Sequence, residues 1–475
     1  MVRPPPLLKH MGGPKGELTV RGNERAPKKR RKVTVSGVLI LLLLVGVCAF
    51  AIFRLRLKWK LGAAMEAIRA AGYPVTCAEL DAWYTIPRDA ENAAYTILDA
   101  LECLQDWDKS ELEAVPLVGR ADLPPRTEPM ADETKALIAE YIADNNETLE
   151  LIHTAAKIEH SRYPVDYSAG FGTLMPHLSQ MRKSLFLLNL EALLHAENGQ
   201  TASSIDSVLS GFGFARSLAK EPSTISQLVR VACDGLTLSA LERIVNRTEL
   251  TDEQLIELSE RLDKVERSSD LTPAFVGERC MGLSFFTVPH SLGSAGLEGI
   301  PVRPILALCQ AVGLVDMDAV IYLDLMTDYL EAHRLPHHQR QEAVGAVNAK
   351  LESTSKVHIF VYALMPPLAR ITTIETRMIA HLRAARVGLA AQRYRLAAGT
   401  LPDTLAELVP TYLDAVPKDP FDGNDLRYER RAAGFVVYSI GEDLRDDGGA
   451  EQLPRSKRPR GQPPQNWDVT FIVER

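Results

Sequence analysis

The chain has 475 residues, of which 46% are hydrophobic and 24% are charged, with 30 Gly and 29 Pro. These values exclude a collagen-like chain, a small disulfide scaffold and a wholly disordered protein, and the length allows about two or three domains. Residues 1–60 carry 14 Lys and Arg against two acidic residues, whereas the remainder carries 40 against 59. A body this acidic is a poor candidate for binding the backbone of nucleic acids, so no nucleic-acid partner is predicted.

An uncharged run of 21 residues, 33–53, follows the basic tail of residues 1–32. A helix of this length reaches about 30 Å, the thickness of a bilayer core, so the run predicts a transmembrane helix and a membrane partner. Ten Lys and Arg precede the run between Arg3 and Lys32, and four follow it between Arg54 and Lys60. This bias predicts a single-pass protein with a cytoplasmic N-terminus and an extracytoplasmic body.

Two other interpretations of this segment stay open. Ala49-Phe50-Ala51 is a loose match to a signal-peptidase site, so the apolar run could be a cleaved signal peptide. The stretch at 27–33 resembles a nuclear localisation signal. A basic run next to an apolar one is more typical of a membrane topology signal, so anchoring remains the preferred interpretation.

The body is predicted to be mainly helical. Residues 61–130 are a mixed segment of helices and loops, ending in a proline-rich stretch. From 132 to 398, apolar residues recur at helical spacing with joints of a few residues, which predicts a domain of helical hairpins. The pattern weakens over 269–300, and the acids Asp316 and Asp318 favour soluble core helices over a second membrane span at 305–323.

One long helix is predicted over 367–398, ended by Gly399. Its Arg side chains are interpreted as its solvent-facing side; they are Arg383, Arg386, Arg393 and Arg395. The chain then changes character. Two β-rich segments, 426–429 and 435–440, predict a hairpin, and they are followed by an acidic Gly-rich loop and a last strand-like stretch at 469–473. The fold class is therefore mainly α, with an N-terminal transmembrane helix, a helical-hairpin body, and a small α+β module with an antiparallel sheet at 399–475.

The C-terminal block, about 80 of the 475 residues, resembles the C-terminal half of the type II secretion major pseudopilins. The matching pieces, in order, are a long helix ending at Tyr394, Gly399, Leu401 and Pro402, then Asp419-Pro420-Phe421, Leu426-Arg427-Tyr428, Tyr438-Ser439-Ile440-Gly441, an Asp-rich Gly-Gly loop, and Asp468. Members of that family are filament subunits with a calcium ion in this loop. The resemblance implies a calcium site with Asp443, Asp447 and Asp468 as carboxylate ligands, and no other cofactor is predicted.

The chain also departs from that family. It lacks the leader cleavage motif and the Glu at the start of the apolar helix, and a basic Pro-rich insert at 454–464 interrupts the loop. We therefore interpret the block as a borrowed module in a bacterial envelope protein with protein partners in the envelope. The interpretation without calcium is that the acids of the loop only form turns on a solvated surface.

Other polar clusters have simple structural interpretations. Glu331, His333, His337 and His338 surround Pro336 and are interpreted as solvated loop residues rather than a metal site. Glu191 and His195, at i and i+4, are interpreted as a pair on the edge of a helix.

Two functions remain. The first is a non-enzymatic, membrane-anchored scaffold or interaction protein. The alternative is a membrane-anchored hydrolase whose site is assembled from scattered acidic and His residues, which a deep polar pocket with converging carboxylates and His would favour.

Overall fold

The computed structural model describes residues 34–105, 107–287, 302–451 and 467–475. The N-terminal tail, 1–32, and the insert, 454–464, lie outside these residues. The chain divides into two compact units, 1–55 and 56–475. Helix α1, Val35–Ala70, is long and apolar enough to cross a membrane, and no other helix among the described residues meets both conditions. Its apolar side chains are exposed over the first unit, Leu43 by 68%.

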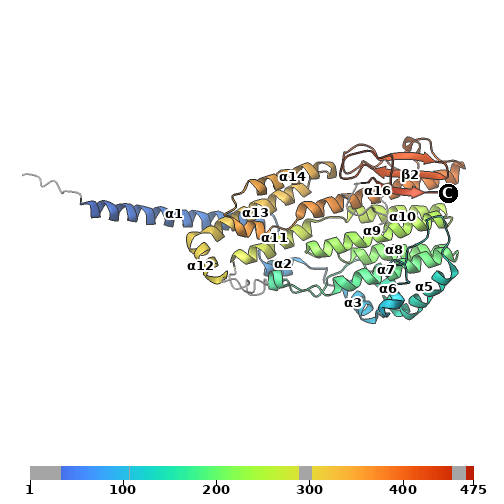
Figure 1. Ribbon diagram of the computed structural model, residues 1–475, viewed down its shortest axis with the longest axis horizontal. Helices are drawn as coiled ribbons and strands as arrows, with labels where there is room; N and C mark the ends of the chain where they lie inside the picture. Colours follow the sequence, from blue (N-terminus) through green and yellow to red (C-terminus); the bar gives the residue numbers. More distant parts are fainter. Residues whose placement is uncertain (1–33, 106, 288–301, 452–466) are drawn as a thin grey trace, which may run out of the picture. The chain divides into compact units, whose positions relative to one another are not determined.

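The second unit contains the last part of α1, followed by short helices and then by longer ones (Figure 1). The short helices and the 3₁₀ helix η1 are α2 (Cys77–Trp83), α3 (Ala93–Cys103), α4 (Lys109–Leu112), α5 (Asp132–Asp144), α6 (Asn146–Lys157) and η1 (Tyr167–Gly172). Thr76 and Asn92 cap α2 and α3, because their side chains accept from the backbone N–H of Glu79 and Ala94. The regular pattern after Asp132 is divided into two helices, because Asn145 has a non-helical backbone.

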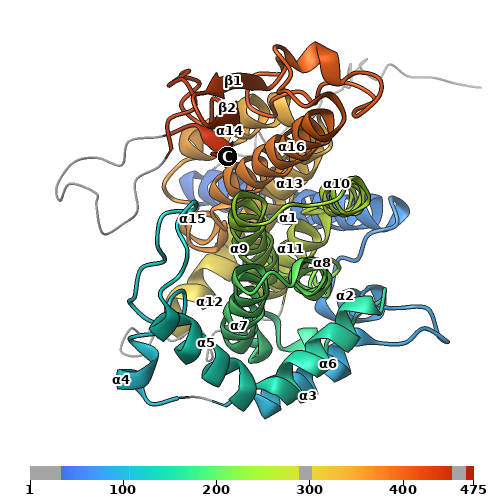
Figure 2. The ribbon, with the colours of Figure 1, turned by 90° about the vertical axis from the view of Figure 1, so that its right-hand side faces the viewer.

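Five long helices form the centre of the unit, and they are α7 (His177–Glu197), α8 (Thr201–Arg216), α9 (Thr224–Arg247), α10 (Asp252–Arg267) and α11 (Thr272–Thr287). Seen along their axes, α7, α8 and α9 lie side by side (Figure 2). The helical pattern weakens over 269–300, of which 288–300 lie outside the described residues, but α11 at the start of this stretch is a helix buried on nearly every side. The pattern is weak there because a helix without a solvent-facing side shows no apolar periodicity.

The next helices are α12 (Val302–Val312), α13 (Leu314–His333), α14 (His337–Ser353) and α15 (Ile359–Leu364). α13 is a core helix, as the acids in its sequence predicted. Asp318 is fully buried, and its carboxylate accepts from His358 Nδ1 and from the backbone N–H of Phe360. The buried acid is therefore hydrogen-bonded, as burial of a carboxylate requires.

The chain ends with α16 (Leu368–Ala398), the 3₁₀ helix η3 (Leu405–Leu408) and three strands. The strands β1 (Arg427–Arg431), β2 (Gly434–Ser439) and β3 (Val469–Val473) form an antiparallel sheet in the order β1-β2-β3. The sheet packs on α16, and Asn246 of α9 donates to the carbonyl oxygen of Ile472 over 2.8 Å. One hydrophobic core extends from Ile68 to Val473. The predicted fold class is confirmed.

Candidate functional site

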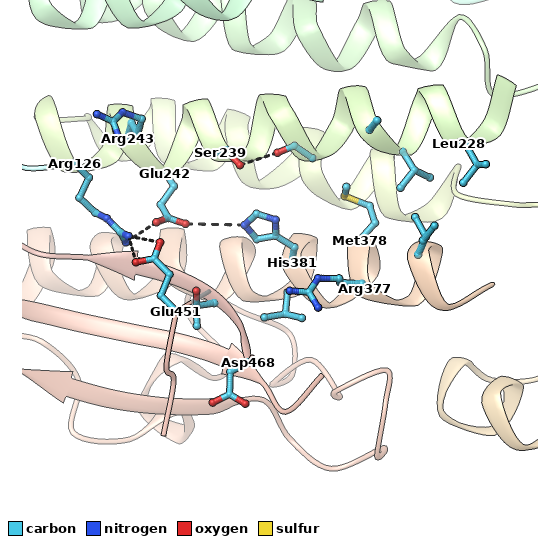
Figure 3. A pocket seen from close by; sticks show the side chains of 16 residues that line it. Arg126, Leu228, Ser239, Glu242, Arg243, Arg377, Met378, His381, Glu451 and Asp468 are labelled. Carbon is cyan, nitrogen blue, oxygen red and sulfur yellow. Dashed lines mark hydrogen bonds and ion pairs between the residues drawn. The ribbon is translucent and has the colours of Figure 1, made fainter. Parts of the chain in front are cut away.

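A cleft with a volume of about 640 Å³ lies between α9, α16 and the start of β3. On α9, its lining residues follow one another at helical spacing from Leu228 to Arg243, and on α16 from Ile374 to His381. Leu228 and Met378 lie toward one end, whereas Arg126, Glu242 and Glu451 gather at the other (Figure 3). The remaining lining residues are Val231, Ala232, Gly235, Ser239, Arg377, Asp468, Val469 and Thr470.

Arg126 holds the charged end of the cleft together. Its Nη1 donates to Oε1 of Glu242 over 2.6 Å, and its Nη2 donates to the carboxylate of Glu451 over 2.5 Å. Its Nε lies 3.7 Å from a carboxylate oxygen of Glu474. Three acids therefore surround one guanidinium, and they raise the pKa of Arg126 although burial opposes them.

Glu242 has an unusual protonation equilibrium. Its side chain is 13% exposed, and burial raises its pKa to about 8. Arg126 opposes this change, whereas Glu451 and Glu474 add to it by repulsion. Glu242 is therefore mainly protonated at neutral pH and can donate a hydrogen bond into the cleft.

His381 is the second polar group of the cleft that stands out. Burial lowers its pKa to about 4, and the charge of Arg377 adds to this effect. Its Nε2 lies 4.0 Å from Oε2 of Glu242 and has no hydrogen-bond partner among the described residues. A neutral imidazole and a protonated carboxyl thus face each other at a distance that leaves both able to bond a ligand.

The structure brings two of the three predicted acids together. Oδ2 of Asp468 accepts from the backbone N–H groups of Asp447 and Gly449, over 3.2 and 2.8 Å. The acidic loop therefore lies beside Asp468, as the sequence analysis predicted. Asp443 instead closes a local turn, because its Oδ1 accepts from the backbone N–H of Arg445.

Asp468 is 2% exposed, and its Oδ1 has no hydrogen-bond partner among the described residues. Burial raises its pKa to about 6, and the charges of Asp447 and Asp446 add to this rise. Within the described part of the chain, no group of three or more His, Cys, Asp or Glu side chains is arranged to hold a metal ion. The calcium site therefore stays a prediction.

The other predicted clusters need correction. His333 is not a solvated loop residue: it ends α13 and is 3% exposed, between Asp270 at 3.5 Å and Glu375 at 3.7 Å. Glu191 does not pair with His195. Its carboxylate accepts instead from Ser207 and lies 2.8 Å from Nε2 of His153.

Sequence reasoning missed the three central groups of the cleft, Arg126, Glu242 and His381. They come from a loop and two helices far apart in the chain, and the sequence offers only one signal for them. Glu242 continues the series Leu228, Ala232, Gly235 and Ser239 at spacings of three or four residues, which places an acid on a face whose preceding members are uncharged. That signal predicts a polar site on α9 but not its partners.

In comparisons with known proteins, no family model, no curated protein and no solved structure matches the chain.

Proposed function

We propose that the protein is a single-pass, membrane-anchored interaction protein of the bacterial envelope, with residues 56–475 outside the cytoplasm. The observation that carries the proposal is the apolar surface of α1, on which residues such as Leu39, Leu43 and Val45 are more than half exposed. Exposing a continuous apolar surface of this length to water costs free energy, whereas the core of a bilayer accommodates it. The ten-to-four excess of Lys and Arg before the run supports the orientation.

Anchoring and orientation are tested separately. The variant Leu42→Lys/Leu43→Lys/Val45→Lys places three charges in the span, each costing about 3 kcal/mol there, so extraction at alkaline pH should release the protein from membranes. The control Leu55→Lys, beyond the uncharged run, should remain bound. A reporter that is active only outside the cytoplasm, fused after Arg475, should be active. Activity of a cytoplasmic reporter alone would overturn the orientation.

The cleft is the proposed place of interaction, and binding is favoured there over hydrolysis. A hydrolytic nucleophile needs a base within hydrogen-bond distance. Ser239 donates to the carbonyl oxygen of Gly235 on its own helix, and Nε2 of His381 has no hydrogen-bond partner among the described residues. An apolar half next to hydrogen-bonding and charged groups suits an amphipathic segment of a partner.

A photoreactive residue at Ala232 in the cleft should form crosslinked products in intact membranes, whereas one at the exposed Glu331 should not. Met378→Trp, which fills the cleft, should abolish the products from Ala232. Equal products from both positions, or products that survive Met378→Trp, would contradict binding in the cleft.

We further propose that the C-terminal block acts as a pseudopilin-like module that binds calcium. Support comes from a long helix followed by an antiparallel sheet, and from a buried carboxylate oxygen without a partner beside Asp446 and Asp447. Calcium would offset the repulsion among these acids and stabilise the folded state by mass action.

Thermal unfolding of the full-length protein should therefore occur at a higher temperature with calcium than with a chelator. Asp468→Asn should remove the difference, whereas Asp425→Asn, whose carboxylate pairs with Lys418, should keep it. Since the pKa of Asp468 is about 6, the effect of calcium should also decline below that pH. Equal midpoints with and without calcium would leave only the turn-forming role of these acids.

A further inference from the structure

A second cavity, of about 540 Å³, lies on another part of the same unit, between the segment after α2, the C-terminal end of α8 and the junction of α10 with α11. Its wall has an aromatic part, where the rings of Tyr73 and Trp83 lie 6.5 Å apart. The wall also contains Arg216 of α8 and Lys264 of α10, which line a small adjoining pocket together with Arg261. None of these residues belongs to the cleft described above.

Neither the cations Arg216 and Lys264 of this wall nor Arg261 of the adjoining pocket has an acidic partner within ion-pair distance among the described residues. Arg216 donates only to two backbone carbonyl oxygens, those of Ala156 and Ile158, over 3.0 and 2.8 Å. In a body where acidic residues outnumber basic ones, three neighbouring cations with no described carboxylate within ion-pair distance are an exception that needs an explanation.

Holding these cations together costs free energy. Burial lowers the pKa of Arg216, and the positive charge of Arg261 lowers it further. The two acids on the cavity wall do not remove the cost. Asp270 accepts from the backbone N–H of Thr272 and lies 3.5 Å from His333. Glu159 is exposed, and its charge only partly offsets the lowered pKa of Arg216. A bound anion would supply the missing negative charge.

A buried hydroxyl on the same wall points to a ligand independently of charge. Ser161 is 8% exposed, and its Oγ has no hydrogen-bond partner among the described residues. A buried hydroxyl without a partner is costly, and a ligand oxygen in the cavity would satisfy it.

We propose that this cavity binds a small organic phosphate whose ring-shaped or apolar body lies against Tyr73 and Trp83, while its phosphoryl group lies among Arg216, Arg261 and Lys264. Phosphate suits the cluster because Arg and Lys together offer several charged N–H donors to its oxygens. The aromatic wall suits a planar body, because ring contacts add affinity without requiring further charges. This binding is distinct from the anchoring and from the cleft, and it goes beyond the proposed function.

The test uses the full-length protein in detergent, with phenyl phosphate, inorganic phosphate and phenol as probes. Calorimetry and the fluorescence of Trp83 report binding. Phenyl phosphate should bind at least tenfold more tightly than inorganic phosphate, phenol should not bind, and added salt should weaken both phosphates. Absence of saturable phenyl phosphate binding, or equal binding of phenol, would overturn the proposal.

Matched variants separate a ligand site from a surface attraction. Arg261→Gln should weaken both phosphates at least tenfold, while the control Arg267→Gln, an exposed cation of the same helix that pairs with Asp263, should leave them unchanged. Trp83→Leu should reduce only the advantage of phenyl phosphate. Because burial lowers the pKa of Arg261 and the charge of Glu257 offsets this only in part, Arg261→Gln should also raise the unfolding temperature of the unliganded protein. Equal weakening by Arg261→Gln and Arg267→Gln, or a lower unfolding temperature for Arg261→Gln, would contradict the proposal.

Discussion

The two halves of α16 are held in the body by opposite means. In its N-terminal half, Glu375 is fully buried, and its carboxylate lies 3.1 Å from Nη1 of Arg340 and 3.7 Å from Nδ1 of His333. In its C-terminal half, small residues let the sheet approach, and a Cβ atom at Gly388 would lie 2.5 Å from the ring of Phe471. One half depends on charges that match across three helices, and the other depends on the absence of side-chain atoms.

This difference determines which substitutions each half tolerates. Removing one member of a buried charge group leaves the others desolvated and unpaired, so the polar half is destabilised by substitutions that remove a polar side chain. A close contact between a helix and a sheet has no room for additional atoms, so the apolar half is destabilised by substitutions that enlarge a side chain. The comparison therefore predicts that a substitution that deletes polar atoms is most harmful near Glu375, and one that adds a methyl group is most harmful near Gly388.

The largest effect is expected from Glu375→Leu. The new side chain fills the space but leaves Arg340 and His333 without their shared carboxylate, which should lower the free energy of unfolding by about 3–5 kcal/mol. Urea unfolding measures the loss. The exposed pair of Glu331 and Arg334 provides the control, because Glu331→Gln should change stability by less than about 1 kcal/mol. Similar losses in both variants would show that the charges near Glu375 are not specially coupled.

In the middle of α16, where His381 faces Glu242, these two groups should make the free energy of unfolding depend on pH. Because the pKa of folded Glu242 is about 8, the unfolded chain releases this proton at lower pH, and stability falls as pH rises from about 4.5 to 8. Glu242→Gln should remove about 4 kcal/mol of that fall while its amide oxygen still accepts from Arg126. Urea unfolding from pH 5 to 8.5 tests this. Parallel profiles for the two proteins would show that Glu242 titrates normally.

His381 should contribute a pH dependence of stability with the opposite sign in the same experiment. Its folded pKa of about 4 lies below the ordinary value, so the unfolded chain binds the proton first as pH falls. Stability that depends on neutral His381 should therefore be lost between about pH 6.5 and 4. Between about pH 4.5 and 6.5 the contributions of Glu242 and His381 have opposite signs and offset each other. His381→Gln should therefore make the fall in stability with rising pH steeper in that range, whereas Glu242→Gln should leave a stability that rises up to about pH 6.5 and is level above it.

The two halves also differ in how far the sequence could predict them. The stripe of Ile371, Met378 and Leu382 and the stop at Gly399 were enough to predict α16, because these signals are local. The sheet and the position of Asp468 beside the acidic loop followed from the turns and strands near them. The partners of Glu375 could not be predicted, since Arg340 and His333 come from other helices and no spacing rule connects them.

The Arg residues of α16 show the same limit. Arg383, Arg386 and Arg393 were expected on a solvent-facing side, but their side chains are only 17–22% exposed and they pair with acids of α10. The helical spacing placed them on one face correctly. It could not show that another helix, itself bearing acids at matching positions, covers that face. Pairing between distant helices is a tertiary property, so hydrophobic periodicity cannot reveal it.

Gly388→Ala should test the apolar half. The methyl group improves helix propensity by about 1 kcal/mol but must displace the ring of Phe471, so the net result should be a loss of about 1–2 kcal/mol. Gly345 of α14 is the matched control, because no atom lies within 4 Å of the position that its Cβ would take. Gly345→Ala should therefore stabilise the protein in the same urea titration. A gain in both variants would show that the sheet can move away from α16 without cost.

The smallest effect is expected where α16 meets α10. Glu266 is 15% exposed and accepts from Nε of Arg383 over 2.8 Å and from Nη1 of Arg386 over 3.2 Å. Hydrogen bonds between charged, partly buried groups contribute more than an exposed ion pair, so Glu266→Gln should cost about 1–2 kcal/mol. A double-mutant cycle with Arg383→Gln isolates the pair and should give a coupling of about 1 kcal/mol. If the two losses add without coupling, these Arg side chains behave as the solvent-facing residues that the sequence predicted, and the covered face of α16 is held by its apolar contacts alone.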